Sequence, residues 1–280
     1  MGVLGEALAS VPGDVPVIVV DNEGLDASAQ LAEAAGATVI RNTRNVGFGA
    51  ACNQGAVLVR TPLVLFLNPD ARLSPGSLER MVGELTSVPG IAATGPVLAR
   101  SGHVDLPRCN SLLDIHCEPG FSTLPKTATD VRFLSGAAML VRTDVFRQIG
   151  GFDERIFLYL EDDDLCFRLR RQGHRLRLVT DAVVAHERTP AAEVPARILR
   201  RQNRSTFMSM RYLAEKYGVS FDFARKRRQA WKRLLLAALL MDRRRIHANL
   251  GRLQGLGVLP SRGNAARQST TGYGVFGLRR

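Results

Sequence analysis

Cysteine is scarce in this sequence, and its spacing excludes two kinds of structural cross-link. The four cysteines form no Cys-x-x-Cys pair, and His103, Cys109, His116 and Cys117 do not have the spacing of a zinc finger. We therefore expect buried or free thiols in a reducing cytoplasm, rather than disulfides or a structural zinc ion.

Long apolar runs are also missing. Residues 1–13 contain no basic start to an apolar segment, so we expect no signal peptide. No apolar run approaches the roughly 18 residues that a membrane-spanning helix needs, and the longest C-terminal candidate, Leu234 to Met241, is far shorter. No transmembrane helix is predicted.

Acidic residues are sparse in the C-terminal third, and this divides the chain by charge. Residues 190–280 contain 20 Lys/Arg and 4 Asp/Glu, whereas the rest of the chain contains 18 and 22, so the excess behind the net charge of +12 lies at the C-terminus. We predict a catalytic domain over residues 1–190, a basic helical extension over 191–250 and a Gly-rich flexible tail over 251–280.

The basic extension has three interpretations. The first is contact with an anionic membrane surface, with Trp231 and Leu234 to Leu240 entering the lipid. The second is a solvated helical pair packed on the catalytic domain. The third, nucleic-acid binding, ranks last because no helix-turn-helix or zinc motif is present and aromatic residues are few. The basic residues concerned are Arg200, Arg201, Arg204, Arg225, Lys226, Arg227, Arg228, Lys232 and Arg233.

Short apolar strands alternate with helices in the first part of the chain. Strands are predicted at 15–20, 37–40, 63–67, 91–94, 176–180 and 183–184, and helices at 26–35, 45–59 and 74–85. This alternation predicts an α/β fold with a mainly parallel sheet of the nucleotide-binding type. Beyond it, residues 193–217 and 222–250 read as two basic helices.

Polar residues follow the predicted strands where a ligand would bind. Asp21 and Asn22 follow the first strand, residues 41–45 the second, and Asn68 with Asp70 the third. In such sheets ligands bind beyond the carboxyl ends of the strands. The Asn68-x-Asp70 pair can hold a divalent cation that bridges a diphosphate, although Asn-Pro-Asp is also a common turn.

The most unusual segment is FLYLEDDDLCFRLRRQG, residues 157–173. Four acidic residues, Glu161 to Asp164, lie between apolar residues and a basic run that reads as a helix ending at Gly173. Adjacent carboxylates repel one another, and a helix start lowers the cost of their charge. The run is either an acidic turn that caps an ordinary helix or a source of catalytic carboxylates.

Six segments together resemble the family 2 inverting glycosyltransferases, and most closely the bacterial rhamnosyltransferases that act on lipid-linked acceptors. They are VIVVDN (17–22), RNTRNVGFGAACNQG (41–55), LFLNPD (65–70), FLSGAAMLVRTDVF (133–146), GGFDERIFLYLEDDDL (150–165) and AVVAHE (182–187). The likeness spans roughly residues 15–215, and six motifs in the same order are far more specific than one.

The resemblance implies donor and metal roles. Its nucleotide-sugar-binding positions fall on Asp21, which contacts the pyrimidine, and on Asn45, Gly47, Asn53 and Asn68. Its metal positions, for Mg²⁺ or Mn²⁺, fall on Asp70 and His186. It implies a GT-A type fold and a dTDP- or UDP-sugar donor.

The resemblance also implies an acceptor side and a base. Ser135, Gly136 and Glu161 line the acceptor side, and Asp162 is the general base, with Asp164 as the alternative. The implied reaction is metal-dependent, inverting transfer of a sugar, with L-rhamnose from dTDP-rhamnose as the best candidate. The implied acceptor is a lipid-linked or polysaccharide glycan in cell-envelope biosynthesis, at the cytoplasmic face of the cell membrane.

The sequence departs from the family pattern at its start. That pattern opens with a further strand, ending in a Thr/Ser-Tyr-Asn turn, which contributes to the sheet and the nucleotide pocket. Only residues 1–14 precede the VIVVDN strand here. The start is either assigned too far downstream, or this is a shortened variant, which makes a non-catalytic relative the alternative function. Gly24 also replaces a usual Ser, and Glu187-Arg188 follow His186 where small residues are usual.

Overall fold

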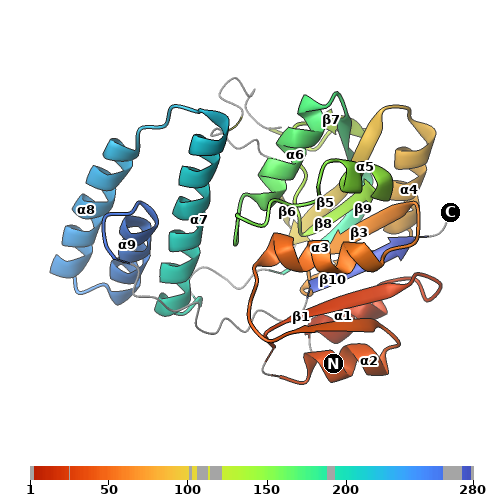
Figure 1. Ribbon diagram of the computed structural model, residues 1–280, viewed down its shortest axis with the longest axis horizontal. Helices are drawn as coiled ribbons and strands as arrows, with labels where there is room; N and C mark the ends of the chain where they lie inside the picture. The colour runs from red at the N-terminus through yellow and green to blue at the C-terminus, as the bar shows by residue number, and fades with distance from the viewer. Residues whose placement is uncertain are drawn as a thin grey trace. The chain divides into compact units, whose positions relative to one another are not determined.

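The computed structural model describes residues 3–24, 26–100, 103–105, 113, 122–187 and 193–260, and the backbone alone of 273–278. The chain divides into two compact units, shown as ribbons in Figure 1. The first comprises Met1–Arg155, Glu161–Arg188 and Ala266–Arg280, and the second Ile156–Leu160 and Thr189–Ala265.

The first unit contains a ten-stranded sheet and six helices among its described residues. In chain order its elements are α1 (Val3–Ala9), β1 (Val17–Asn22), α2 (Ser28–Ala34), β2 (Thr38–Asn42), α3 (Phe48–Leu58), β3 (Leu63–Leu67), β4 (Ala71–Leu73), α4 (Ser77–Ser87), β5 (Ile91–Arg100), β6 (His103–Asp105), β7 (Thr129–Val131), β8 (Ala138–Arg142), α5 (Thr143–Gln148), α6 (Glu161–Arg171), β9 (Arg175–His186) and β10 (Tyr273–Leu278).

The strand order is β2-β1-β10-β3-β8-β5-β9-β4, with β6 beside β5 and β7 beside β9. Strands β1, β2, β3, β5 and β9 run in one direction, while β8 and β10 run antiparallel to both of their neighbours. The predicted α/β fold with a central sheet is confirmed. The sheet is mixed rather than mainly parallel, because β8 and β10 insert between strands that share a direction.

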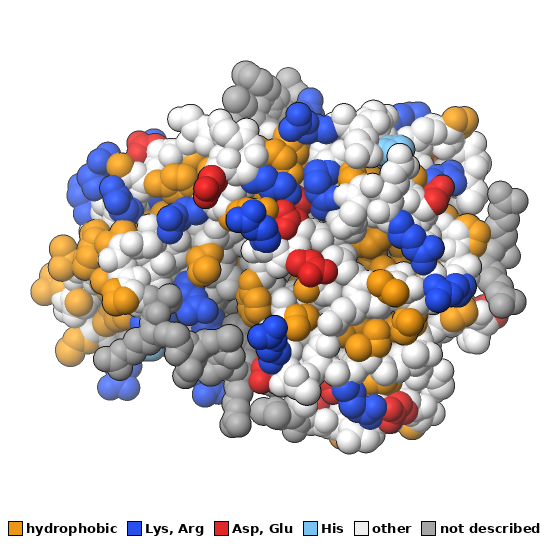
Figure 2. All heavy atoms as spheres, viewed as in Figure 1, with side chains coloured by type: hydrophobic (Ala, Val, Ile, Leu, Met, Phe, Trp, Pro, Cys, Tyr) orange, Lys and Arg blue, Asp and Glu red, His pale blue; other side chains and the backbone are white. Residues whose placement is uncertain are grey.

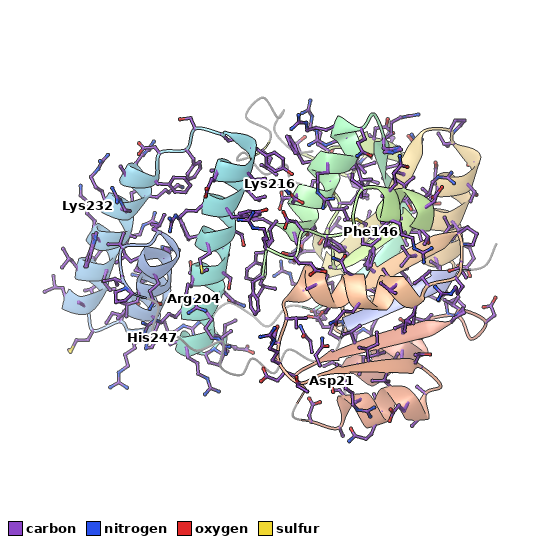
Figure 3. The ribbon with its side chains drawn as sticks, in the orientation of Figure 1. Asp21, Phe146, Arg204, Lys216, Lys232 and His247 are labelled. Atoms are coloured by element: carbon purple, nitrogen blue, oxygen red, sulfur yellow. The ribbon has the colours of Figure 1, made fainter. Side chains whose placement is uncertain are left out.

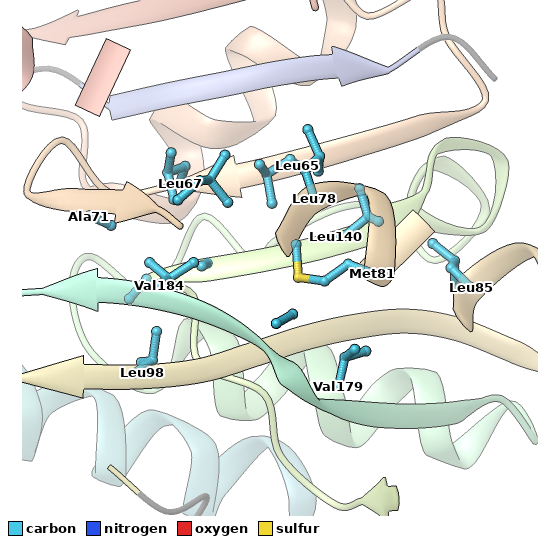
Figure 4. Close-up of a cluster of buried hydrophobic side chains, with 14 of the residues drawn as sticks. Leu65, Leu67, Ala71, Leu78, Met81, Leu85, Leu98, Leu140, Val179 and Val184 are labelled. Carbon is cyan, nitrogen blue, oxygen red and sulfur yellow. The ribbon is translucent and has the colours of Figure 1, made fainter. Parts of the chain in front are cut away.

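Apolar runs form the strands at the centre of this sheet. All five residues of β3 are buried, and five of the six residues of β1 are buried. Continuous burial of this kind occurs where both faces of a sheet are covered. On one face, Met81 and Leu85, four residues apart on α4, pack with Leu65 and Leu140 in the cluster drawn in Figure 4.

Two strands are longer in the structure than predicted. The segments predicted as separate strands at 176–180 and 183–184 form one long strand, β9, that pairs with β5 on one side. Strand β1 extends through Asp21 and Asn22, which pair with Arg41 and Asn42 of β2. The polar residues predicted to follow β1 are therefore held by the sheet itself.

The second unit contains three helices in its described residues: α7 (Ala196–Tyr217), α8 (Phe223–Leu239) and α9 (Arg243–Gly255). The prediction of a single helix over 222–250 is wrong. Met241 has a left-handed φ of 51°, and Asp242 then caps α9 by accepting a hydrogen bond from the Arg245 backbone nitrogen at 2.9 Å.

The structure also differs from the predicted flexible tail over 251–280. Helix α9 continues to Gly255, because Gly251 and Gly255 allow it to approach α7: a Cβ on either would overlap the carbonyl oxygen of Arg200 or Arg204. Residues 273–278 form β10. No helix in the described part of the chain combines the length and apolar character needed to cross a bilayer.

Candidate functional site

Asn22, at the end of β1, organises the loop after β2. Its buried amide nitrogen donates to Asn45 Oδ1 at 3.0 Å and to the Gly47 carbonyl oxygen at 3.2 Å. Its Oδ1 accepts from the Val46 backbone nitrogen at 2.9 Å and from Asn42 Nδ2 at 3.2 Å. One fully buried side chain therefore fixes this loop and brings the predicted residues Asn45 and Gly47 to the end of β1.

Gly47 makes the entry into α3. Its φ of 98° and ψ of 165° lie in a region that side chains other than glycine rarely adopt. Asn45 Oδ1 also accepts a hydrogen bond from the Gly47 backbone nitrogen at 2.9 Å. Gly47 therefore supplies the backbone conformation that this turn requires, at a position where the resemblance implies nucleotide binding.

Asp21 lies beside Asn22 and forms a tight turn with Gly24. The Gly24 backbone nitrogen donates to Asp21 Oδ1 at 2.6 Å, and Asp21 is largely buried. A Cβ on Gly24 would overlap that carboxylate oxygen. Glycine at this position, where the family pattern has Ser, is thus required by the turn. Figure 3 labels Asp21 at this end of β1.

Asn53, also predicted to bind nucleotide, makes different contacts. Its Nδ2 donates to the Phe152 carbonyl oxygen at 2.9 Å and to Glu154 Oε1 at 3.1 Å, and its Oδ1 accepts from the Phe152 backbone nitrogen at 2.9 Å. These bonds join α3 to the segment after α5. The structure does not bring Asn53 into the Asn22 hydrogen-bond network.

Asn68, Asp70 and His186 come together beyond the end of β3. Strand β4 places Ala71 opposite His186 at the end of β9. His186 Nε2 lies 3.2 Å from Asp70 Oδ1 and 3.4 Å from Asn68 Nδ2. The imidazole is buried, whereas the Asp70 side chain is 37% exposed, so a ligand can reach the carboxylate.

These three side chains fit a divalent cation. Asn68 Oδ1 and His186 Nδ1 are buried and have no hydrogen-bond partner among the described residues. Carboxylate and amide oxygens suit Mg²⁺ and Mn²⁺, and imidazole suits transition metals. The described residues contain no group of three His, Cys, Asp or Glu placed to hold a metal. A cation here would thus depend on ligand oxygens, such as those of a diphosphate, to complete its coordination.

Residues 135–137 connect this metal-type cluster to the acidic helix α6. The Asn68 backbone nitrogen donates to the Ala137 carbonyl oxygen at 2.9 Å. The adjacent Gly136 backbone nitrogen donates to Asp162 Oδ2 at 2.9 Å. Ser135 Oγ accepts from the Ala137 backbone nitrogen at 3.3 Å. Two neighbouring residues, Gly136 and Ala137, therefore bring the start of α6 to the end of β3.

The two candidate bases have different environments. Asp162 is partly exposed, and its oxygens accept from the Gly136 nitrogen and, at 3.0 Å, from the Asp163 nitrogen. Asp164 has a fully buried side chain whose Oδ2 lies 2.7 Å from Arg168 Nε. An acceptor hydroxyl can reach Asp162, whereas Asp164 is occupied by an ion pair.

Arg168 also binds backbone carbonyl groups of the segment after α5. Its other guanidinium nitrogens donate to the Ile149 carbonyl oxygen at 2.9 Å and the Gly151 carbonyl oxygen at 2.7 Å. The pair Asp164–Arg168 thus ties α6 to the segment after α5. The spacing of four residues on a helix was a signal in the sequence that Asp164 would be paired.

Glu161 is a buried carboxyl at the first position of α6. Burial raises the pKa of Glu161 well above its usual value, and the negative charge of Asp162 raises it further. Glu161 Oε2 has no hydrogen-bond partner among the described residues. A protonated Glu161 reduces the repulsion within the acidic run and leaves Asp162 as its accessible charged neighbour.

The two cysteines in the described part of the chain are unsuited to act as nucleophiles. Cys52 and Cys166 are free and buried, as expected, and burial raises the pKa of both thiols. Cys109 and Cys117 lie outside the described residues. The sequence analysis did not predict that Asn22 would hold the loop after β2 by hydrogen bonds. The signal in the sequence was an Asn at a strand end together with the Asn-rich segment RNTRN.

The sequence is similar to those of several known proteins. A family model described as "Glycosyl transferase family 2" matches residues 3–150. The N-acetylglucosaminyl-diphospho-decaprenol L-rhamnosyltransferase of Mycobacterium tuberculosis is 27% identical over 235 residues, covering 72% of this chain and 76% of that protein. The rhamnosyltransferase WbbL of Escherichia coli is 47% identical over 51 residues, covering 18% of this chain and 19% of that protein.

Solved structures share the fold. GalNAc-T7 with UDP, GalNAc and Mn²⁺ has a TM-score of 0.59 at 14% identity, covering 86% of this chain and 50% of its own. The mannosyltransferase PcManGT of Pyrobaculum calidifontis, with GDP-Man and Mn²⁺, has a TM-score of 0.57 at 15% identity, covering 91% and 82%. The predicted GT-A type fold is confirmed; at these identities the likeness concerns the fold alone.

Proposed function

Because the chain belongs to glycosyl transferase family 2, we propose that it is a metal-dependent inverting glycosyltransferase. Its proposed reaction moves a sugar from a nucleotide donor to a lipid-linked or polysaccharide acceptor of the cell envelope. The observation that carries the proposal is the pair of adjacent residues Gly136 and Ala137, whose backbone links Asp162 to the Asn68–Asp70–His186 cluster. A base and a diphosphate site must be neighbours in such a reaction.

The donor end is formed by β1 and the loop that Asn22 holds. Asp21 accepts a hydrogen bond from the pyrimidine imide of a dTDP- or UDP-sugar, and Asn45 and Gly47 shape the wall of the nucleotide site. Hydrogen bonds that are buried or partly buried already fix Asn45 and Gly47 in the free protein. Preorganisation of this kind reduces the ordering cost of binding.

Asp70 and His186, with the side-chain oxygen Oδ1 of Asn68, would hold a Mg²⁺ or Mn²⁺ ion. Bound there, the cation would neutralise charge on the leaving nucleoside diphosphate. His186 is buried and closes one side of the cluster. Asp70 is partly exposed, so the other side is open to ligand oxygens.

Asp162 is the proposed general base. It removes the proton of an acceptor hydroxyl as that oxygen attacks the anomeric carbon, and the bond from that carbon to the diphosphate oxygen breaks. One displacement inverts the configuration. Ser135, Gly136 and Glu161 form the acceptor side, and the Gly136 N–H holds the Asp162 carboxylate in position.

L-rhamnose from dTDP-rhamnose is the proposed sugar, and a lipid-diphosphate glycan the proposed acceptor. The support is the mycobacterial relative, whose name describes rhamnosyl transfer to a decaprenol-linked glycan. The test uses purified protein with Mn²⁺, a panel of dTDP- and UDP-sugars and a lipid-diphosphate-sugar acceptor. Transfer that needs metal and disappears in Asp162→Asn supports the proposal; transfer that Asp162→Asn leaves intact refutes the assignment of the base.

A peripheral position at the cytoplasmic face of the membrane is proposed from the surface of α8. Large apolar side chains at its C-terminal end are exposed, with Leu239 at 80% and Met241 at 84%. The others are Trp231, Leu235, Leu236 and Leu240. Exposed Lys232, Arg233, Arg243 and Arg245 flank them. Figure 2 shows hydrophobic side chains gathered at this end of α8 with basic ones nearby, a combination that suits an anionic bilayer.

Vesicle sedimentation tests this surface. We expect binding to vesicles that contain phosphatidylglycerol, weaker binding to neutral phosphatidylcholine, and at least a tenfold loss in the triple variant Leu235→Ser, Leu239→Ser, Met241→Ser. The matched control is Leu31→Ser, an exposed apolar residue on α2. Equal binding of the triple variant and the control would contradict the assignment.

A second candidate function is a non-catalytic protein that keeps the fold with a weakened donor site. It is favoured by one observation: the strand between β1 and β3 is supplied from the C-terminus, unlike the opening strand of the family pattern. Metal-dependent turnover would refute this candidate.

A further inference from the structure

The C-terminal strand β10 lies between the two strands that carry the donor-side residues. Val17–Val20 of β1 pair with Tyr273–Phe276 on one side, and Leu63–Leu67 of β3 pair with Gly274–Leu278 on the other. Figure 1 shows this strand, in blue, between β1 and β3. Strand β10 lies about 250 positions after its partner β1 in the sequence.

We infer that β10 is a working component of the nucleotide-sugar site, acting as the spacer that sets the distance between its two halves; this inference rests on the proposed function. Neighbouring strands lie about 4.8 Å apart, so one intervening strand holds β1 and β3 about 9.6 Å apart. Direct pairing of β1 with β3 would halve that spacing and bring Asp21 against Asn68.

The register places one end of β10 at the donor edge. Tyr273 pairs with Val20, which directly precedes Asp21, and Gly274 pairs with Leu67, which directly precedes Asn68. One further step along the β3 register sets Tyr273 level with Asn68. The backbone of Tyr273 and Gly274 therefore lies between the polar ends of the two strands.

Burial explains why the space between β1 and β3 requires a strand. Both strands are apolar and almost entirely buried. Without β10, each would present a row of unpaired backbone N–H and C=O groups inside the unit, which is costly away from water. The Asn22 network is built on the end of β1, so an unsupported β1 would also release loop 42–47.

Hydrogen exchange of the full chain tests the placement of β10 without any ligand. We expect the backbone amides of residues 274–278 to exchange at least about 100-fold more slowly than in an unstructured peptide, as those of a central strand do. Exchange at the rate of an unstructured peptide would overturn the inference.

A proline substitution tests the coupling to the donor site. Val275 pairs with Ile18 and Phe66, so Val275→Pro removes a backbone donor from the middle of a central strand. We expect faster exchange in loop 42–47 and at least a tenfold weaker affinity for dTDP or UDP with Mn²⁺. The control, Gln268→Pro, lies outside the strand. Unchanged loop exchange in Val275→Pro would overturn the inference.

A second variant covers the case in which Val275→Pro does not melt cooperatively. In the full chain, Val275→Gly weakens the strand and keeps its backbone donor. Faster exchange in loop 42–47 together with weaker nucleotide binding supports the inference, and faster exchange of residues 274–278 with unchanged exchange in loop 42–47 overturns it. A full chain with a protected β10 that binds no nucleotide would instead contradict the proposed function.

Discussion

Substitutions at Asp162 and Asp164 separate catalysis from stability within one turn of α6. Asp164→Asn removes the charge that pairs with Arg168 in a fully buried position. Breaking a buried ion pair costs about 3–5 kcal/mol. Arg168 is 18% exposed and keeps two carbonyl acceptors, so the lower figure, about 3 kcal/mol, applies. At about 2–4 °C per kcal/mol, the Tm should fall by about 6–12 °C.

Asp162→Asn should have the opposite pattern. An amide oxygen can still accept from the Gly136 nitrogen, and loss of one charge relieves repulsion in the acidic run. We expect a change in unfolding free energy of about 1 kcal/mol or less. Turnover should fall by about 10²–10⁴-fold, the usual contribution of a general base.

The assay compares thermal melting and metal-dependent sugar transfer for the two variants, with Asp163→Asn as the matched control on the same turn. The reasoning would be refuted by an Asp164→Asn protein that keeps its Tm and loses transfer, because Asp164 would then be the base. An Asp162→Asn protein with more than a third of the original rate would refute it equally.

Four further outcomes follow from the described geometry. Gly24→Ser should lower the free energy of unfolding by about 1–3 kcal/mol and weaken nucleotide binding, because the added Cβ overlaps Asp21 Oδ1. Gly83→Ala lies in open space on α4 and should raise the free energy of unfolding by about 0.5–1 kcal/mol. Thermal melts measure both changes in stability, and nucleotide titrations measure the binding. The pKa of Glu161 is raised in the folded state, so its contribution to stability is present below about pH 4.5 and is lost as pH rises through the raised pKa. Melts from pH 4 to 9 should therefore show Glu161→Gln gaining on the natural protein as pH increases, and parallel curves would contradict this. Asp70→Asn should abolish any Mn²⁺-dependent increase in Tm with nucleotide, while metal-free melting stays within about 2 °C of the natural protein; an undiminished increase would remove Asp70 from the metal site.

The sequence predicted the elements whose signals are local. The apolar run of β3 was placed at its observed bounds because five buried residues in a row, closed by Asn68-Pro69, have a single good interpretation. Helix α6 and its acidic first turn were also predicted, since both the charges and Gly173 at its end are local signals. Asn68 and Asp70 were expected at the edge where strand ends gather, and the family resemblance implied that His186 would lie beside Asp70.

Features that depend on distant partners could not be predicted. Nothing near Asn53 indicates that its amide bonds to Phe152, 99 residues away. The glycines at 251 and 255 read as flexible, although they are close contacts between α9 and α7. The segment YGVFGL contains strand-forming Tyr, Val and Phe, but it was not predicted as a strand because the sequence around it is glycine-rich and basic. Its place between β1 and β3 is a property of the whole sheet.

The position of β10 also has a consequence for biosynthesis. Strand β1 leaves the ribosome early, but its central neighbour is encoded about 250 residues later. At about 5–20 residues per second, translation leaves that gap open for about 13–50 s. During this interval the nascent chain carries two unpaired apolar strand edges, which are sites of misassociation. The sheet therefore cannot be completed before residues 273–278 have been synthesised, and until then the two strand edges must be protected from misassociation.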